Sequence, residues 1–265
     1  MTVPADWLVP DWPAPARVKA LCTTRRGGQS RPPYDLLNLG THVGDDLDDV
    51  RANRAALQRV LGVRPVFLEQ VHGTQVQPLA ADMPDGTPAD ACLATQPGVA
   101  CTIMVADCLP ILLCDASGTW VAAAHAGWRG LAGQGGVGVV ESTLAAVHAS
   151  NRALAPVDSA LEAPKTIAWL GPCIGPMAFE VGDEVRQAFV DGTPEAADCF
   201  APASPGKWLA NLPALARQRL LAAGVTAVYG NDGSTPWCTV SNPSRFFSHR
   251  RDRVSGRFAA CIWLD

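Results

Sequence analysis

The stretch Ala100–Gly130 reads ACTIMVADCLPILLCDASGTWVAAAHAGWRG and alternates short apolar runs with polar breaks. Its three apolar runs, bounded by Asp, Pro or Gly, are Thr102–Val105, Ile111–Cys114 and Trp120–Ala124. Runs of this length and composition are typical of buried strands. Cys108 lies between the first two runs, and His125 directly follows the third. Because scaffolds present reactive side chains where strands end, we predict that Cys108 and His125 carry chemistry.

A third candidate lies upstream, where Pro65–Glu69 predicts a strand that runs into Gln70-Val71-His72-Gly73. One thiolate and two imidazoles supply three metal ligands and leave one tetrahedral position for water or substrate, which is typical of catalytic zinc. Each residue also has a plain explanation, since Cys is often a small core residue and a buried His often bonds a backbone carbonyl. Cys108 and His125 can equally form a nucleophile and base pair. Spacing alone leaves both interpretations open.

Further strands and helices are predicted on both sides of the central stretch. The strands are Val18–Thr24, Ala89–Leu93, Thr166–Leu170, Val225–Tyr229, Phe246–Ser248 and Arg257–Trp263. The helices are Asp48–Leu61, a segment that ends near Ala149, Asp183–Val190 and Leu212–Ala223. Strands and helices are mixed without strict alternation, so we expect a mixed α/β (α+β) single domain with mixed sheets flanked by helices. Ser150–Pro164 is read as a linker that does not separate domains.

Composition narrows the class of protein. A chain of 265 residues with 48% hydrophobic content can bury a full core. The formal net charge of −4 argues against bulk electrostatic binding of nucleic acid. No apolar run reaches the length needed to span a membrane, and the first residues do not resemble a signal peptide. Nine cysteines without a C-x-x-C motif fit a reducing cytoplasm, with these read as core filler: Cys22, Cys92, Cys101, Cys114, Cys199, Cys238 and Cys261.

Several long motifs occur in a fixed order along the chain: LEQVHG, ADCLPILLCD, HAGWRG, GPCIG followed by FEVG, and FFSHRRD followed by GRFAACIWL. Together they resemble the laccase-domain proteins, also called polyphenol oxidases or peptidoglycan editing factors. Members of that family are treated as purine nucleoside phosphorylases with adenosine deaminase activity. The resemblance implies one catalytic domain over residues 1–265, a fold similar to the cytotoxic necrotising factor catalytic domain, and zinc bound by His72, Cys108 and His125.

The resemblance therefore predicts a phosphorylase that cleaves inosine or adenosine with phosphate, with possible adenosine deaminase and methylthioadenosine phosphorylase activities. The expected partners are a nucleoside and phosphate, without nucleic acid or membrane, and the expected assembly is a monomer or homodimer. A Cys-His hydrolase and a cell-wall editing factor are the alternatives. The five histidines are too few for a blue-copper centre plus a three-copper cluster, so phenol oxidation is disfavoured, although Cu²⁺ can replace Zn²⁺ in a His₂Cys set.

Other polar residues in the matching motifs are predicted to line the pocket. Asp107 joins the three ligands as a catalytic candidate, and the substrate or phosphate candidates are Arg25, Asn38, Arg129, Cys173, Glu180 and Arg251. Arg129 stands beside a predicted helix N-terminus, where it can bind phosphate or form a surface ion pair, and the sequence leaves both interpretations open. Gly133-x-Gly135-x-x-Gly138 matches the dinucleotide fingerprint only weakly, and we interpret it as close backbone packing. The cytidine-deaminase signature does not occur in the sequence.

Overall fold

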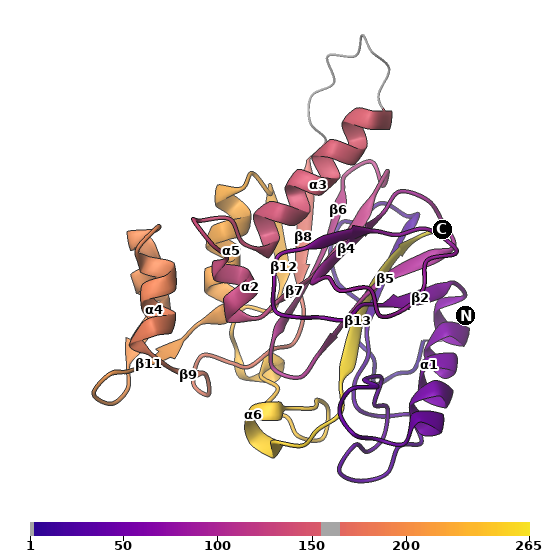
Figure 1. Ribbon diagram of the computed structural model, residues 1–265, viewed down its shortest axis with the longest axis horizontal. Coiled ribbons are helices and arrows are strands. Elements are labelled where there is room, and N and C mark those ends of the chain that lie inside the picture. The colour runs from indigo at the N-terminus through magenta and orange to yellow at the C-terminus, as the bar shows by residue number, and fades with distance from the viewer. Residues whose placement is uncertain (1–2, 155–164) are drawn as a thin grey trace.

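The computed structural model describes residues 3–154 and 165–265, which form two large sheets, a small sheet and covering helices (Figure 1). The six-stranded sheet has the order β12-β8-β6-β7-β4-β3. Its strands are β3 (Val76–Pro78), β4 (Ala91–Ala94), β6 (Leu109–Asp115), β7 (Val121–Ala126), β8 (Thr166–Leu170) and β12 (Ala227–Gly230). The outer pairs β3–β4 and β12–β8 are parallel and the inner pairs are antiparallel. The sheet is therefore mixed, as predicted.

The four-stranded sheet has the order β1-β13-β5-β2 and packs against the six-stranded sheet. Its strands are β1 (Val18–Cys22), β2 (Arg64–Phe67), β5 (Val99–Val105) and β13 (Phe258–Leu264). β2 and β5 run parallel, and the other two pairs are antiparallel. Ile103 from this sheet and Leu112 from the other belong to the same buried cluster, so one shared core joins the two sheets.

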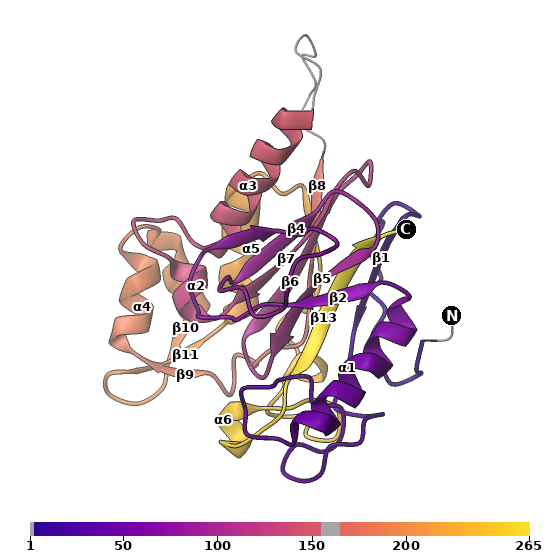
Figure 2. The ribbon, with the colours of Figure 1, turned by 45° about the vertical axis from the view of Figure 1, so that its right-hand side comes forward.

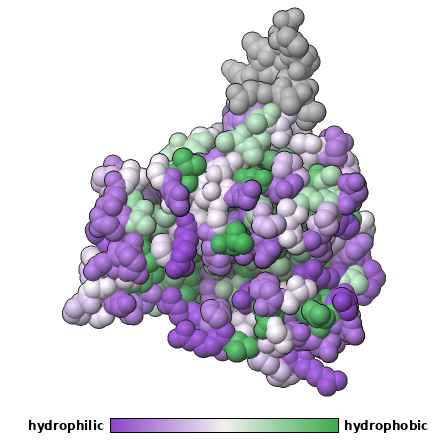
Figure 3. Space-filling model, viewed as in Figure 1, coloured by the Kyte–Doolittle hydropathy of each residue, from purple (hydrophilic) through white to green (hydrophobic). Residues whose placement is uncertain are grey.

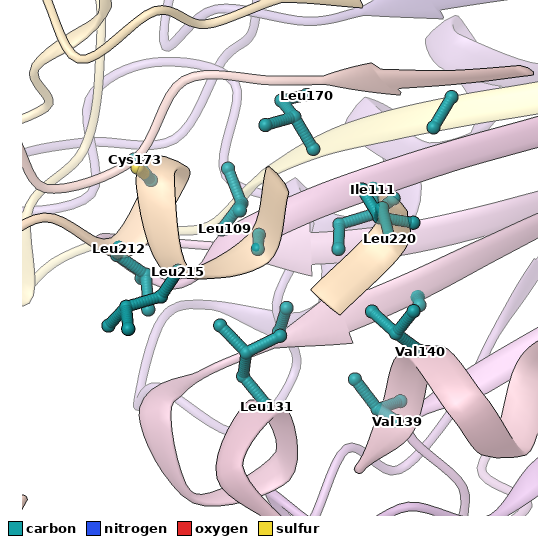
Figure 4. Close-up of a cluster of buried hydrophobic side chains, with 14 of the residues drawn as sticks. Leu109, Ile111, Leu131, Val139, Val140, Leu170, Cys173, Leu212, Leu215 and Leu220 are labelled. Atoms are coloured by element: carbon teal, nitrogen blue, oxygen red, sulfur yellow. The ribbon is translucent and has the colours of Figure 1, made fainter. Parts of the chain in front are cut away.

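The alternation of side chains along β6 explains the layers. Leu109, Ile111 and Leu113 point to the helical side, whereas Leu112 and Cys114 point to the other sheet. Figure 4 shows Leu109 and Ile111 among side chains of the helical layer, including Leu131, Val140 and Leu220. That layer contains α2 (Trp128–Ala132), α3 (Val139–Leu154) and α5 (Leu212–Ala222). A strand buried on both faces needs a continuous apolar run, and LPILLC supplies it.

On the opposite side, α1 (Leu47–Leu61) covers the outer face of the four-stranded sheet (Figures 1 and 2). The Asp46 side chain accepts hydrogen bonds from the first-turn N–H groups, and Gly62 ends the helix with φ of 72°. The apolar positions Val50, Leu57 and Leu61 face inward. The sequence predicted this helix from the same features, namely acids in the first turn and glycine after the last.

A small third sheet stands apart from the two large ones, beside α4 (Asp183–Val190) in Figure 2. Its order is β10-β11-β9, from β9 (Glu180–Gly182), β10 (Phe200–Pro202) and β11 (Lys207–Ala210), and a 3₁₀ turn (Pro194–Cys199) precedes β10. A second 3₁₀ turn (Thr235–Trp237) and the short α6 (His249–Asp252) complete the described elements. On the face shown in Figure 3, hydrophobic residues form small separate groups among hydrophilic ones.

The fold confirms the α+β class and most predicted elements, with two corrections. The strand predicted at Phe246–Ser248 is wrong: the Phe246 N–H bonds the Asn242 carbonyl in a turn, and the Ser248 side chain caps α6. Phe246 and Phe247 are both buried. A short apolar run is typical of a buried strand, which explains the wrong prediction. The linker predicted at Ser150–Pro164 is helical up to Leu154, and its remainder, 155–164, lies outside the described residues.

The glycine-rich segment after α2 packs closely against neighbouring backbone, as predicted. A Cβ at Gly133 would overlap the carbonyl of Val137, and one at Gly138 would overlap the carbonyl of Leu131. Gly133 also adopts φ of 66°, which favours glycine. The spacing of these glycines follows from close backbone packing.

Candidate metal and anion site

The candidate site begins where the chain crosses from one large sheet to the other. β5 ends at Val105 and β6 begins at Leu109, so residues 106–108 bridge the two sheets. Asp107 forms this corner with a φ of 94°, a backbone conformation that residues other than glycine rarely adopt. Its backbone carbonyl accepts the N–H of Ile174 at 2.9 Å. The corner places Cys108 at the edge of the core that the two sheets share.

Two histidines meet Cys108 from other strand ends. His125, near the end of β7, alternates with Ala124 and Ala126, so it shares the face of Ala123 towards the four-stranded sheet. His72 follows β2 in a left-handed conformation with φ of 61°. The ligand atoms of His72, Cys108 and His125 all lie within 4.8 Å of one another, with Cys108 Sγ 3.7 Å from His72 Nε2. The three predicted ligands therefore converge.

Asp90, a residue that the sequence analysis did not single out, connects both histidines. The carboxylate is fully buried, and its Oδ1 accepts His125 Nδ1 at 2.8 Å and the His72 N–H at 2.9 Å. Its Oδ2 accepts the N–H groups of Val71 at 3.2 Å and Gly73 at 2.6 Å. Burial works against the charged form, but the hydrogen bonds from His125 and Gly73 keep the pKa of Asp90 below its usual value. Asp90 is thus a charged acceptor behind the ligands.

The glycines of HAGWRG are needed for close approach to these ligands. A Cβ at Gly127 would lie 2.9 Å from His72 Cδ2 and 3.0 Å from Cys108 Sγ. A Cβ at Gly130 would lie 2.7 Å from the carbonyl of Gly73. Contacts under 3.0 Å require something to shift, so a larger residue at position 127 would push the ligands apart. The glycines of the motif therefore allow α2 to pack closely against the ligands.

The site also shifts the proton affinities of its members. Burial would raise the pKa of the Cys108 thiol, but the charge and hydrogen bond of His125, together with His72, lower it to about 6. Burial would lower the pKa of His125, but the Cys108 thiolate and Asp90 raise it to about 9. In the metal-free protein, thiolate and imidazolium therefore coexist near neutral pH.

The donor set fits a metal ion. A low-pKa thiolate and two imidazoles are soft to borderline ligands, which suit zinc and copper rather than magnesium or calcium. A side chain at Gly127 would fill the space beside two of the donors, and the sequence keeps that space open. Among the residues that the structure describes, His72, Cys108 and His125 make up a group that could hold a metal ion.

A cavity of about 410 Å³ opens in front of the three ligands. Its lining includes the cationic or imidazole groups of Arg250, Arg253, Arg257, His42 and His249. Its apolar lining includes Met104, Val105, Ile174 and Phe179. A volume of this size is in the range of small-molecule pockets. One cavity thus combines metal ligands, positive charge and an apolar wall.

Asp107 lines the cavity but uses its carboxylate to hold neighbouring chain segments. Its Oδ1 accepts the Thr239 hydroxyl at 2.6 Å, and its Oδ2 accepts the Arg250 N–H at 2.6 Å. Arg250 belongs to α6, which also presents His249 to the cavity. Asp107 thereby fixes the cationic wall relative to Cys108. Its predicted catalytic role stays a prediction.

Arg25 and Asn38, predicted as pocket residues, lie outside the cavity lining. The Arg25 guanidinium pairs with Asp35 at 3.2 Å and lies over the Phe247 ring at 4.7 Å. Asn38 is buried, and its Oδ1 accepts the backbone N–H of Arg257 at 2.8 Å. Both residues tie the long loop before α1 to the C-terminal segment. Asn38 does not line the cavity, but it holds the backbone of Arg257, which does.

Arg129 and Glu180 are exposed and also lie outside the lining. The Arg129 guanidinium stacks over the Trp128 ring at 4.4 Å. Glu180 begins β9, and its backbone carbonyl accepts Arg250 Nη1 at 3.0 Å. Its contact with the cavity wall therefore runs through the main chain.

Cys173 and Arg251 likewise bond within the fold, outside the cavity lining. Cys173 is fully buried, burial raises the pKa of its thiol, and Asn231 donates to its sulfur at 3.3 Å. Arg251 donates to the Thr239 carbonyl at 2.6 Å and pairs with Asp252 at 2.6 Å. The roles predicted for these residues in substrate binding stay predictions.

Comparisons with known proteins agree with this architecture. The model of the family described as multi-copper polyphenol oxidoreductase laccase matches residues 19–265. A protein of Pseudomonas aeruginosa named purine nucleoside phosphorylase is 52% identical, covering 98% of each chain, and the Escherichia coli purine nucleoside phosphorylase YfiH is 46% identical, covering 97% of this chain and 98% of its own.

Two solved structures share the fold. A Neisseria meningitidis protein has a TM-score of 0.86 at 49% identity, covering 98% of this chain and 99% of its own. YlmD from Geobacillus stearothermophilus has a TM-score of 0.80 at 34% identity, covering 94% and 92%. Among the described residues, no helix is both long and apolar enough to cross a membrane. The family match, the relatives and the shared fold confirm what the motifs predicted: the chain belongs to the multi-copper polyphenol oxidoreductase laccase family.

Proposed function

We propose that this chain is a zinc-dependent purine nucleoside phosphorylase that cleaves inosine or adenosine with phosphate. The observation that carries the proposal is the composition of one cavity, which has a His₂Cys ligand group on one wall and three arginines among its other lining residues. The arginines can bind phosphate, and a metal held by the ligand group can act as a Lewis acid towards a substrate oxygen. The relatives named purine nucleoside phosphorylase support the same assignment.

Arg253 and Arg257 are the residues we assign to phosphate. Among the described residues, the Arg253 guanidinium makes no hydrogen bond or ion pair, so its donors are available to a ligand. Arg257 lines the cavity, and its Nη1 donates to the carbonyls of Ser255 and Gly256, which hold the guanidinium in place at the cavity. Arg250 already donates Nη1 to the carbonyls of Ala178 and Glu180. Guanidinium groups bind phosphate with paired donors.

The apolar wall is assigned to the base. Phe179, Ile174 and Met104 line the cavity and offer a surface on which a purine can pack. In the proposed reaction, a phosphate oxygen forms a bond to C1′ of the ribose while the bond from C1′ to the purine nitrogen breaks. The base leaves with the proton that phosphate brings, and ribose 1-phosphate remains. The arginines hold phosphate for this attack and balance its charge.

Zinc, when bound, would act as a Lewis acid towards a substrate oxygen or water. His72, Cys108 and His125 would hold it, and Asp90 would keep His125 oriented. We favour zinc over copper because three ligands with one open position match catalytic zinc sites. The same open position is available to water, so slower adenosine deamination belongs to the proposal. Methylthioadenosine cleavage breaks the same kind of bond. We place the enzyme in the cytoplasm as a monomer or homodimer.

A Cys-His hydrolase is the second candidate, favoured by one specific feature. Cys108, His125 and Asp90 are arranged as nucleophile, base and orienting carboxylate, and the pKa of Cys108 is about 6. The two candidates predict opposite responses to metal. Chelation abolishes a zinc enzyme, whereas it releases the thiolate of a cysteine hydrolase.

The proposal is tested with purified protein, inosine, and matched samples with and without phosphate or chelator. We expect hypoxanthine and ribose 1-phosphate only when phosphate is present, loss of turnover on chelation, recovery with zinc, and no oxygen uptake. Equal base release without phosphate would overturn the phosphorylase, and activity that survives chelation would favour the hydrolase. Oxygen uptake would favour the oxidase that the family description names.

Arg253→Ala and Arg129→Ala form a matched pair for the phosphate site. Both remove one arginine, but only Arg253 lines the cavity. We expect the phosphate KM to rise about tenfold or more in Arg253→Ala, because a charge-assisted hydrogen bond contributes roughly 1.5–3 kcal/mol. Arg129→Ala should leave it within about twofold on this assignment. The reverse result would restore Arg129 as the phosphate ligand.

A further inference from the structure

We propose that Asp90 is the positioning residue that assembles the metal site, because one buried carboxylate fixes two ligands that come from separate strand ends. The proposal rests on the metal ligands of the proposed function and does not depend on the nucleoside chemistry. Asp90 acts through His72 and His125, so it is not itself a ligand or a catalytic residue.

The first part of the role concerns His125. Its Nδ1 lies 2.8 Å from Asp90 Oδ1, and an ionised carboxylate only accepts hydrogen bonds. The proton of the imidazole is therefore held on Nδ1, which leaves Nε2 for a metal. The backbone adds to this restraint, because the His125 N–H donates to the Asp90 carbonyl at 2.7 Å. A carboxylate behind a ligating histidine orients the ring and raises its basicity.

The second part concerns His72, which lies 18 residues before Asp90 in the sequence. Three consecutive N–H groups, those of Val71, His72 and Gly73, converge on the Asp90 carboxylate at 3.2, 2.9 and 2.6 Å. Such a run of N–H groups forms a concave anion site. His72 itself has φ of 61°, and a left-handed residue other than glycine is strained unless its surroundings hold it in place. The carboxylate supplies that hold.

Asp90 bonds both histidines, whereas a residue behind a single ligand bonds only one. Loss of the carboxylate would release the ring of His125 and the backbone of His72 together. Loss of a single partner behind one ligand typically costs about 10–100-fold in metal affinity. We therefore expect Asp90→Asn to weaken zinc binding about 10–100-fold, and Asp90→Ala to weaken it further.

Asp115 provides the matched control. It is also a fully buried aspartate that accepts backbone N–H groups, those of Thr119 and Trp120, and it also bonds one side chain, the Thr119 hydroxyl. It lies at the far end of β6 from Cys108. Asp115→Asn should lower the unfolding midpoint in urea as Asp90→Asn does, yet it should keep zinc affinity within about twofold of the wild type. A purely structural role for Asp90 would give the two variants the same zinc affinity.

The test measures zinc affinity by competition with a chromophoric chelator, alongside urea unfolding of the metal-free proteins. The proposal is overturned if folded Asp90→Asn and Asp90→Ala bind zinc within about threefold of the wild type. An independent measurement uses wild-type protein alone, labelled with ¹⁵N in its histidines and loaded with zinc. We expect the His125 proton on Nδ1 and the metal on Nε2, and metal on Nδ1 would overturn the proposal even if no variant folds.

These readouts separate this proposal from the proposed function. Wild-type protein that cleaves inosine with phosphate, together with Asp90 variants of unchanged zinc affinity, would overturn only the positioning role. Zinc affinity that depends on Asp90 in a protein without nucleoside turnover would support the positioning role and overturn the phosphorylase.

Discussion

The two ends of β6 carry the same pair of residue types and use them in opposite ways. Asp107-Cys108 stands just before the strand, and Cys114-Asp115 ends it. Burial and the neighbouring Asp115 charge raise the pKa of Cys114 to about 12, whereas the histidines, acting against burial, bring that of Cys108 down to about 6. A cysteine in this strand is therefore a core residue or a ligand according to what surrounds its sulfur, which residue type alone does not reveal.

The two aspartates differ in a parallel way. Asp115 closes a turn within its own hairpin, bonding Thr119 and Trp120 a few residues later. Asp107 bonds Thr239 and Arg250, which are more than a hundred residues away. One end of β6 thus supports local structure. The other joins distant segments around a cavity, which is what a functional site requires.

Thiol reactivity should show the largest difference between the two ends. At pH 7 about nine-tenths of Cys108 should be thiolate in the metal-free protein, against about one part in 10⁵ of Cys114. Iodoacetamide should therefore label Cys108 first, with a rate that rises through a midpoint near pH 6, and zinc should protect it. Peptide mass spectrometry identifies the labelled site. Preferential labelling of Cys114 would break the comparison.

The second-largest difference should be in zinc binding, between substitutions of Cys108 and of the buried cysteines. Cys108→Ala removes one of three ligands, so we expect zinc affinity to fall more than about 100-fold, beyond what loss of a supporting residue costs. Cys114→Ala and Cys101→Ala should retain about one zinc per chain, because both sulfurs are buried core contacts. Elemental analysis after gel filtration measures the content. Full zinc in Cys108→Ala would sink the ligand assignment.

The sequence predicted most of this arrangement but not its supports. The strand ends that carry Cys108 and His125, and the caps of α1, were predictable because strand length, apolar runs and helix-stop residues are local signals. Asp90 carries no such signal: it precedes β4 as an ordinary acid, and its partners lie 18 and 35 residues away.

The sequence analysis did not predict the arginines that line the cavity. Arg253 directly follows α6, a helix of only four residues that apolar periodicity cannot predict, whereas Arg257 directly precedes β13. His249, in the FFSHRRD motif, also lines the cavity. Arg25 lies in a matching motif segment, but its guanidinium bonds Asp35 in the long loop before α1. It therefore stabilises that loop. The resemblance to the necrotising-factor fold stays a prediction.

Zinc affinity should also depend on pH in a way that only the Cys108 end can produce. His125 has a pKa of about 9, so below that pH zinc must displace one proton from its imidazolium. Affinity should therefore rise about tenfold per pH unit between pH 7 and 8.5, while the Cys108 thiolate, with its pKa of about 6, contributes no further proton. Competition titrations, corrected for protonation of the chelator, measure the slope. A flat profile would contradict the thiolate and imidazolium pair.

The smallest effect should come from the far end of the strand. Asp115→Asn keeps the side-chain shape but turns one acceptor oxygen into a donor, at a carboxylate that bonds two backbone N–H groups and a hydroxyl. We expect the free energy of unfolding to fall by about 1 kcal/mol, with nucleoside turnover unchanged. Urea denaturation of the zinc-free protein measures it. A loss of turnover without a loss of stability would show that the two ends of β6 are coupled.

X-ray absorption at the zinc edge tests the central claim most directly, because it reports the ligands of the bound ion. Zinc-loaded wild-type protein should show one sulfur at about 2.3 Å and two imidazole nitrogens at about 2.0–2.1 Å, with one further light ligand. In Cys108→Ala the sulfur shell should vanish, and in Cys114→Ala it should remain. A spectrum without sulfur, or with two or more sulfurs, would contradict a site made of His72, Cys108 and His125.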